Sequence, residues 1–257
     1  MRLIRHDTVD STSERAFAAL EAGDARDGDA HVARVQTLGR GRRGRAWHGS
    51  EESLLVSFVH RPPPPGPAPQ GLTMAAGVAL LDTLTGLGAD GLRLDWPNDV
   101  VHEDAKLAGI LTESRGLDPA RPAYVVGVGL NVLQRSFPTE LAAERPVTSL
   151  ARIGLETTPV AVLEALHPNL VRRLHEARTE PGAVDRAYLD ALGLRGRAVL
   201  VQGADGEHAG RLEGLDSDQG VRLATGRGET LVLPLPRIQA LTLATAGWAE
   251  SGRPGAE

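Results

Sequence analysis

Residues 92–131 decide the fold, because four strand-like segments follow one another closely there: LRLDW (92–96), NDVVHE (98–103), KLAGILTES (106–114) and AYVVGVGL (123–130). Turn-forming residues separate the first three, at Pro97–Asn98 and at 103–105. Such short links join antiparallel neighbours, whereas parallel strands need a crossover of a dozen or more residues. We therefore expect an α+β fold with a mixed, mostly antiparallel sheet rather than a doubly wound parallel one.

The N-terminal third supplies further elements. Apolar and polar residues alternate in three segments that we expect to be strands, at 2–8, 29–37 and 53–60. Ser11 followed by Glu14 predicts a helix that begins with a capping box. A second helix, rich in Ala and Leu, is expected at 71–87.

Two more helices are predicted before residue 193. Thr158 and Pro159 form a typical helix start, and Pro168 should kink or split the helix that follows. Another helix covers about 182–191. After "LGLRGR" (192–197) short strands alternate with Asp/Gly turns, and five strands in about 50 residues predict a small barrel. We therefore divide the chain into a catalytic domain (1–192), a C-terminal barrel (193–244) and a disordered tail (245–257).

Composition excludes several classes of protein. The 257 residues contain no cysteine, which rules out disulfides, thiolate nucleophiles and Cys-based metal sites. The sequence has no apolar run long enough to span a bilayer and no signal-peptide pattern at its start. These features predict a cytoplasmic protein that does not bind a membrane. The formal net charge is −5, which disfavours nucleic-acid binding.

The basic residues are unusual. Lys106 is the only lysine among 28 Lys and Arg residues. Codon bias explains the arginines, but a single retained lysine suggests a site where a compact ammonium is needed and a planar guanidinium does not serve.

Residues 39–47, GRGRRGRAW, form an arginine-rich loop. The loop matches G-x-G-x-x-G as text, but a strand follows it, whereas a dinucleotide fingerprint requires a helix. Three interpretations compete: a nucleic-acid patch, a solvated loop, and a mobile loop that closes over a phosphate-containing small molecule. We favour the last, because glycine permits close backbone approach and arginine supplies forked donors to phosphate.

Two further patterns point to chemistry. Asp99 and Lys106 lie near the facing ends of neighbouring strands, so they should converge, either as a site for Mg²⁺ and phosphate or as an ordinary surface ion pair. Gly127 and Gly129 lie inside the buried segment VVGVGLN (125–131), where glycine marks close approach of a ligand or of another backbone.

Taken in order, these motifs resemble the biotin protein ligases: QTLGRGRRGRAW (36–47), DWPNDV (95–100), KLAGIL (106–111) and VGVGLN (126–131), with DSTS (10–13) upstream. The resemblance implies a catalytic domain followed by an SH3-like barrel. It also implies that biotin and ATP, with Mg²⁺, give biotinyl-5′-AMP, from which biotin passes to a lysine of a biotin carboxyl carrier protein domain. A lipoate or octanoate ligase of the same fold and, from another class, a nucleic-acid-binding module are the alternatives.

The resemblance also implies roles for individual residues. Lys106 and Arg42 would be catalytic, and Asp99 would be a metal ligand. Biotin would be bound by Ser11, Thr12, Ser13, Gln36, Gly39, Arg40, Lys106, Gly127 and Gly129. ATP or the adenylate would be bound by Arg42, Arg43, Arg45, Trp47, Asn98 and Asn131.

Some features depart from the family pattern or from its longer members. Ser13 replaces the usual Asn, and Asp95 replaces the Lys that usually precedes W-P-N-D, which reverses a charge near the nucleotide. The first predicted strand begins almost at Met1, so we expect a ligase without a DNA-binding domain. A homodimer is an alternative to a monomer, because the family often pairs its catalytic sheets.

Overall fold

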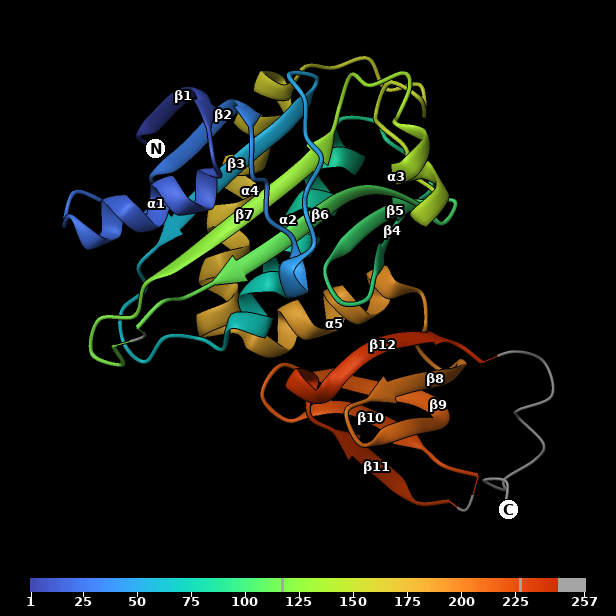
Figure 1. The fold of residues 1–257 in the computed structure, drawn as a ribbon. Helices are drawn as coiled ribbons and strands as arrows, with labels where there is room; N and C mark the ends of the chain where they lie inside the picture. Colours follow the sequence, from blue (N-terminus) through green and yellow to red (C-terminus); the bar gives the residue numbers. More distant parts are fainter. Residues whose placement is uncertain (117, 227, 245–257) are drawn as a thin grey trace.

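A seven-stranded sheet forms the larger part of the molecule, in the order β1-β2-β3-β7-β6-β5-β4 (Figure 1). The structure is a computed structural model that describes residues 1–116, 118–226 and 228–244. The predicted tail (245–257) lies outside the described residues. The strands are β1 (Leu3–Val9), β2 (Ala30–Gln36), β3 (Ser53–His60), β4 (Leu92–Asp95), β5 (Asp99–His102), β6 (Ala105–Glu113) and β7 (Tyr124–Asn131).

The pairing of these strands confirms the mixed, mostly antiparallel sheet. Only β1 and β2 pair in parallel in this sheet, and helix α1 (Thr12–Glu21) connects them. The segments from 92 to 131 form the expected meander, because β4, β5, β6 and β7 are consecutive antiparallel neighbours. The meander places Gly109 and Leu111 of β6 opposite Gly129 and Gly127 of β7, and the start of β5 on the other side of Gly109.

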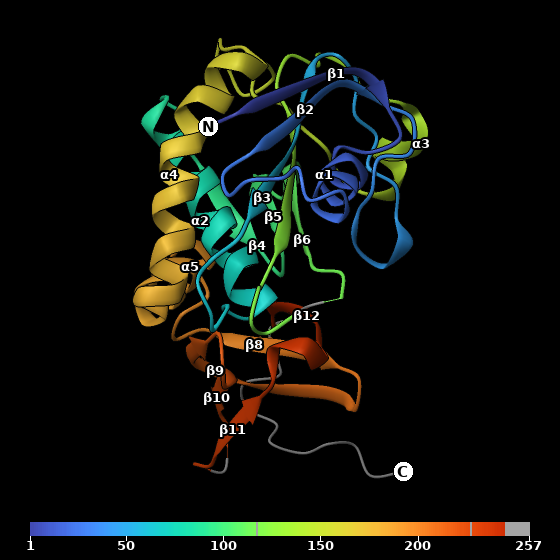
Figure 2. The same ribbon diagram turned by 90° about the vertical axis from the view of Figure 1, so that its left-hand side faces the viewer.

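Helices cover both faces of the sheet (Figure 2). Helices α2 (Pro69–Gly86), α4 (Pro159–Thr179) and α5 (Pro181–Leu192) lie on one face, and α1 and the short α3 (Thr139–Glu144) lie on the other. The first face holds the main core, which is built mostly from Ala, Leu and Val, as a chain with few aromatic residues requires. No helix in the described ranges combines the length and apolarity needed to cross a bilayer.

The start of α1 differs from the predicted capping box. Ser11 is the N-cap, but its side chain accepts from the backbone N–H of Ser13 rather than from that of Glu14. Glu14 does not reach back to Ser11, whose N–H donates to Asp10 instead at 2.7 Å. The carboxylate of Glu14 pairs with two arginines, Arg40 and Arg115, whose charges attract it more strongly than a neutral N–H does.

Pro168 does not split the helix in which it lies. Helix α4 continues from Pro159 to Thr179, so the predicted split is wrong, whereas the predicted kink stays a prediction. The side-chain amide of Asn169 donates to the carbonyl of Ala165 at 3.3 Å and to the hydroxyl of Thr83 in α2 at 3.0 Å. These bonds and packing on α2 hold the helix together across the proline, because tertiary contacts can outweigh a local propensity.

The C-terminal part contains the five predicted strands: β8 (Ala198–Gly203), β9 (Gly206–Asp216), β10 (Gly220–Ala224), β11 (Thr230–Leu233) and β12 (Ile238–Leu243). They form one antiparallel sheet in the order β11-β10-β9-β8-β12 beside α5 (Figure 1). Within 193–226 and 228–244 no ladder joins β11 to β12, so closure into an SH3-like barrel stays a prediction. The domain boundary near 193 also stays a prediction.

Candidate active site

A cavity of about 380 Å³ opens on the sheet face that carries α1 and α3. Its walls come from the start of α1, the arginine-rich loop, β3, the β5–β6–β7 strands and the segment around α3. Of the predicted site residues, these line it: Ser11, Thr12, Ser13, Gln36, Arg40, Arg42, Arg45, Trp47, Asn98, Asp99, Lys106, Gly127, Gly129 and Asn131. Gly39 and Arg43 do not line this cavity.

One end of the cavity is a cluster of hydroxyl and amide groups. Ser57 Oγ lies 2.7 Å from Thr12 Oγ1 and 3.0 Å from Ser13 Oγ. Gln36 Oε1 accepts from the backbone N–H of Thr12 at 2.7 Å and from its hydroxyl at 3.0 Å. The cluster ties the start of α1 to β2 and β3, and it places several neutral donors and acceptors in this end of the cavity.

Ser57 was missed by the sequence analysis. It is fully buried in the middle of the strand SLLVSFVH, between apolar neighbours on both sides. A serine flanked by apolar residues in a buried strand is a signal that could have been used, because a buried hydroxyl needs a hydrogen-bond partner. Its partners lie 44 and 45 residues away, however, and only the fold identifies them.

Trp47 lies across a floor made of two glycines. Gly109 of β6 and Gly129 of β7 are cross-strand partners. A Cβ on Gly129 would meet Trp47 Cε2 at 2.4 Å, and one on Gly109 would meet Trp47 Cζ3 at 3.2 Å. The absence of side chains on both residues therefore lets the indole pack flat against the sheet. The indole N–H is buried against the sheet and has no hydrogen-bond partner within the described ranges.

Gly39 shapes the base of the same loop. A Cβ there would lie 2.4 Å from the carbonyl oxygen of Trp47, and the N–H of Trp47 donates to the carbonyl of Gly39 at 2.9 Å. The two ends of the arginine-rich loop therefore approach each other more closely than any larger residue would allow. Arg43, at the tip, has a positive φ of 55°.

The opposite end of the cavity is strongly charged. Lys106 Nζ lies 2.8 Å from Asp99 Oδ1, which confirms that these two residues converge. The ammonium also lies 5.5 Å from the centre of the Trp47 ring. The Lys106 side chain is 25% exposed and that of Asp99 is 8% exposed, so the lysine faces the cavity while the carboxylate is buried beneath it.

Arg145 completes this charged end, and the sequence analysis missed it. It follows α3, and its guanidinium donates to Asp99 Oδ2 at 2.5 Å and to Asp95 Oδ2 at 2.8 Å. The aspartate at position 95, a departure from the family pattern, thus faces an arginine in the structure. No local signal marks Arg145, because it lies 46 and 50 residues from its partners.

The described residues do not form a magnesium site of their own. Both oxygens of Asp99 face cations, and the described ranges contain no group of three His, Asp or Glu side chains placed to hold a metal. Mg²⁺ prefers hard oxygen ligands in octahedral geometry and usually binds through few carboxylates together with substrate phosphates. The role of Asp99 as a metal ligand stays a prediction.

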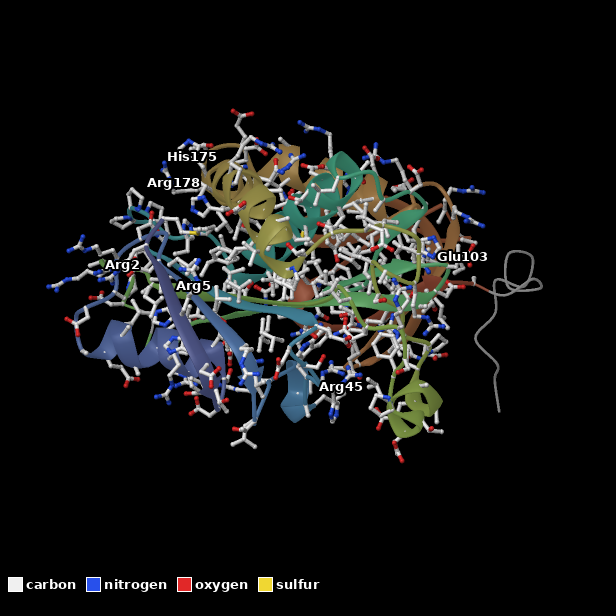
Figure 3. All side chains as sticks on the ribbon, turned by 90° about the horizontal axis from the view of Figure 1, so that it is seen from above. Arg2, Arg5, Arg45, Glu103, His175 and Arg178 are labelled. Atoms are coloured by element: carbon white, nitrogen blue, oxygen red, sulfur yellow. The ribbon has the colours of Figure 1, made fainter. Side chains whose placement is uncertain are left out.

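The arginines of the loop differ in their surroundings. Arg40 pairs with Glu14 and, at 2.8 Å, with Glu113. Arg42 donates to Asn98 Oδ1 at 3.4 Å, and burial lowers the pKa of its guanidinium. Arg45 is exposed on the α1 and α3 side of the sheet, opposite His175 and Arg178 of α4 (Figure 3). Among the residues that the structure describes Arg45 forms no ion pair, whereas Arg40 is already held by two carboxylates.

Two asparagines and a tyrosine fix the frame of the site. Asn98 Nδ2 donates to the carbonyl of Ile110 at 2.7 Å, and Asn131 Nδ2 donates to that of Thr148 at 2.9 Å. Tyr188 of α5 donates to the carbonyl of Pro97 at 2.8 Å. The amide nitrogens therefore hold neighbouring backbone in place, and the turn that carries Asn98 and Asp99 is anchored to a helix on the far face.

The chain is similar to known ligases over most of its length. Residues 6–131 match the model of the biotin/lipoate A/B protein ligase family. The biotin–[acetyl-CoA-carboxylase] ligase of Paracoccus denitrificans is 33% identical over 90% of this chain and 97% of its own length. The bifunctional ligase/repressor BirA of Escherichia coli is 33% identical over 66% of this chain, but the match spans only 51% of that protein.

A solved structure gives the same result for the fold. The biotin protein ligase of Aquifex aeolicus, in complex with biotin and ATP, superposes with a TM-score of 0.77 and 27% identity. The superposition covers 95% of this chain and 99% of that one. From its sequence motifs, its fold and these similarities, the chain belongs to the biotin/lipoate A/B protein ligase family.

Proposed function

We propose that this chain is a biotin protein ligase. It joins the carboxylate of biotin to the AMP part of ATP, and then transfers the biotinyl group to a lysine of a biotin carboxyl carrier protein domain. The observation that carries this proposal is a single cavity with a hydroxyl-rich end, a cationic end around Lys106, and Trp47 along its wall. The similarity to ligases named for biotin and acetyl-CoA carboxylase supports this substrate over lipoate or octanoate.

In the first step, a carboxylate oxygen of biotin attacks the α-phosphorus of ATP. The bond to the oxygen that bridges the α- and β-phosphates breaks, and pyrophosphate leaves. The hydroxyl cluster of Thr12, Ser13 and Ser57 suits the polar ring of biotin, because it offers neutral donors and acceptors. The carboxylate then points toward Lys106, whose ammonium draws the two negative reactants together.

Lys106 stabilises the charge that gathers on the α-phosphate as the new bond forms. A unit charge at about 4 Å contributes at most ~4 kcal/mol at an effective dielectric constant of about 20. That limit corresponds to roughly a thousandfold in rate. Arg42, half-buried on the same side, adds a second cation with a planar, forked donor geometry.

In the second step, the amine of the carrier lysine attacks the carbonyl carbon of the mixed anhydride. An amide bond forms, and AMP leaves with the electron pair of the broken C–O bond. Because water attacks mixed anhydrides as well, a loop that covers the adenylate protects it. We assign this role to the arginine-rich loop, with Arg43 and Arg45 on the phosphates and Trp47 against the adenylate.

The remaining assignments are proposals of the same kind. Ser11, Gln36, Gly39, Arg40, Gly127 and Gly129 would shape the biotin end, and Asn98 and Asn131 the nucleotide end. Mg²⁺ would enter with the phosphates of ATP. The cytoplasmic location, the homodimer and the absence of membrane or DNA binding stay predictions.

Pyrophosphate release from ATP tests the proposal. We expect release on addition of biotin but not of lipoate or octanoate in parallel reactions, and loss of release in Lys106→Ala. Release with lipoate or octanoate alone would assign the chain to the sister activity within the family. If no acid gives release, the ligase proposal is wrong, and salt-sensitive binding of DNA or RNA would then favour the nucleic-acid alternative.

A further inference from the structure

The segment at 145–148 runs directly beside the catalytic lysine. The backbone N–H of Lys106 donates to the carbonyl of Pro146 at 2.8 Å, and its carbonyl accepts from the N–H of Thr148 at 2.9 Å. The carbonyl of Thr148 also accepts from Asn131 in β7. The segment therefore fixes the backbone on both sides of Lys106.

The same segment reaches the side chain of Lys106 through Asp99. One oxygen of Asp99 faces Lys106 Nζ at 2.8 Å, and the other accepts from Arg145 at 2.5 Å. A single buried carboxylate is thus shared between two cations. Arg145 is itself held by Asp95 at 2.8 Å, and Asp95 lies 3.4 Å from Arg93. The charges alternate along the row from Arg93 to Lys106, so each ion has a partner of opposite sign.

That Asp99 is shared between Lys106 and Arg145 has a consequence for the reaction. To act on biotin and ATP, the ammonium of Lys106 must interact with new negative groups while it remains near Asp99. A buried carboxylate that faced only Lys106 would compete with those groups for its charge. A carboxylate that also binds a guanidinium holds the ammonium less strongly, because its negative charge is divided and the guanidinium repels the ammonium.

We propose that Arg145 is a positioning residue for Lys106: by occupying one oxygen of Asp99, it lets that carboxylate orient the ammonium over Trp47 without neutralising it. Asp95 holds Arg145 in place for this purpose. The consequence for turnover rests on the proposed function, whereas the effect on Lys106 itself does not.

The sequence makes a direct test available, because Lys106 is the only lysine. Acetic anhydride at fixed pH labels Lys106 and the N-terminal amine, and mass spectrometry gives the ratio of the two rates without any need for activity. An ammonium bound tightly by an undivided carboxylate is less available to the reagent and reacts more slowly. We expect Arg145→Gln to slow the relative labelling of Lys106 several-fold, and Arg145→Lys, which keeps the charge, to restore most of it.

Two other variants extend this test. Asp95→Asn removes the carboxylate that holds Arg145 beside Asp99, so labelling should slow in the same direction as in Arg145→Gln, but by less. Arg135→Gln is the matched control: Arg135 lies between β7 and α4, as Arg145 does, but within the described part of the chain its ion-pair partner is the exposed Glu156, at 3.5 Å. Its removal should leave labelling unchanged.

A double mutant separates positioning from folding. In an Asp99→Asn background the shared carboxylate is gone, so adding Arg145→Gln should no longer change labelling. Equal slowing in both backgrounds, or unchanged or faster labelling in Arg145→Gln alone, would overturn the proposal. Thermal unfolding of each variant shows whether the fold persists, and Arg145→Lys serves if the glutamine variant does not fold.

Turnover gives the second readout. In Arg145→Gln we expect the kcat of biotin-dependent pyrophosphate release to fall about tenfold, which is ~1.4 kcal/mol, with the KM for biotin within about twofold of wild type. A raised KM with normal kcat would instead make Arg145 a simple binding residue. If the wild-type protein releases no pyrophosphate with any acid, the proposed function fails, while the labelling still decides the role of Arg145.

Discussion

Adding one methyl group at Gly129 should displace the arginine-rich loop while leaving the sheet intact. The Cβ of an alanine there would lie 2.4 Å from Trp47 Cε2, 2.7 Å from Nε1 and 2.8 Å from Cδ2. Carbon atoms in contact prefer a separation of about 3.5–4.0 Å, so the ring must move by about 1 Å or more. Strand β7 cannot yield, because β3 pairs with it on one side and β6 on the other.

The cost should therefore appear in the loop rather than in global stability. Overpacking of a well-packed core costs about 1–3 kcal/mol, but a loop that moves away relieves most of it. We expect the free energy of unfolding to fall by less than about 1 kcal/mol. Displacing Trp47 also removes its contact with Lys106, and a misplacement of about 1 Å at a catalytic group can cost about a hundredfold in rate.

Three measurements test this on Gly129→Ala and wild type side by side. Trypsin cleaves after arginine, so a displaced loop at 39–47 should be cut faster there. Biotin-dependent pyrophosphate release should fall by about ten- to a hundredfold. Thermal unfolding should change little. Gly86→Ala, at the end of α2 with nothing within 4 Å of the added Cβ, is the matched control and should behave as wild type in all three.

The result that refutes the reasoning is a Gly129→Ala protein with wild-type cleavage at the loop and wild-type turnover. The position of the Trp47 ring would then not depend on the absence of a side chain at Gly129. A large loss of stability without faster cleavage at the loop would also contradict it, because the strain would have gone into the sheet.

The other predictions concern the two ends of the cavity and the first strands. Lys106→Ala and Lys106→Arg should both release pyrophosphate at least roughly a hundredfold more slowly, while both variants melt near the wild-type temperature. The arginine variant should fail because a planar guanidinium cannot replace the compact ammonium between Asp99 and Trp47. Near-normal turnover of the arginine variant would contradict this. Ser57→Ala removes the hydroxyl that Thr12 and Ser13 share, and it should raise the KM for biotin about tenfold without changing the KM for ATP. Thr179→Ala is the control, because the exposed hydroxyl of Thr179 bonds only to the carbonyl of His175 in its own helix as the structure describes it, and it should change neither KM. Burial, together with the charge on His6, lowers the pKa of His31 to about 4. The unfolded chain takes up this proton near pH 6.5 and the folded chain does not, so stability should fall as the pH falls from 6.5 towards 4. Urea unfolding at pH 7 and pH 4.5 measures this loss of unfolding free energy, and His31→Gln should reduce it by about 2 kcal/mol. The control His175→Gln, at an exposed histidine, should leave the loss as in wild type. An equal loss in wild type and both variants would assign the acid sensitivity to other groups.

Local pattern was sufficient for most of the elements. Short turns between strand-like segments predicted the meander from β4 to β7, because loop length limits which strands can be neighbours. Local pattern was insufficient where a residue far along the chain changed the local structure. Glu14 pairs with arginines rather than with the start of its own helix, and α4 continues through Pro168 because it packs on α2.

The chain's motifs by themselves determined the fold class, the family and most of the residues that line the cavity, because they occur at fixed places on consecutive elements. Only the tertiary structure decided which of them meet. It placed Trp47 on a floor of Gly109 and Gly129, and it brought Ser57 to the start of α1. It also brought Arg145 to Asp99 across 46 residues of chain. The register between paired strands and the paths of the loops that pack against the sheet set these contacts, and neither can be read from the spacing of residues along one segment.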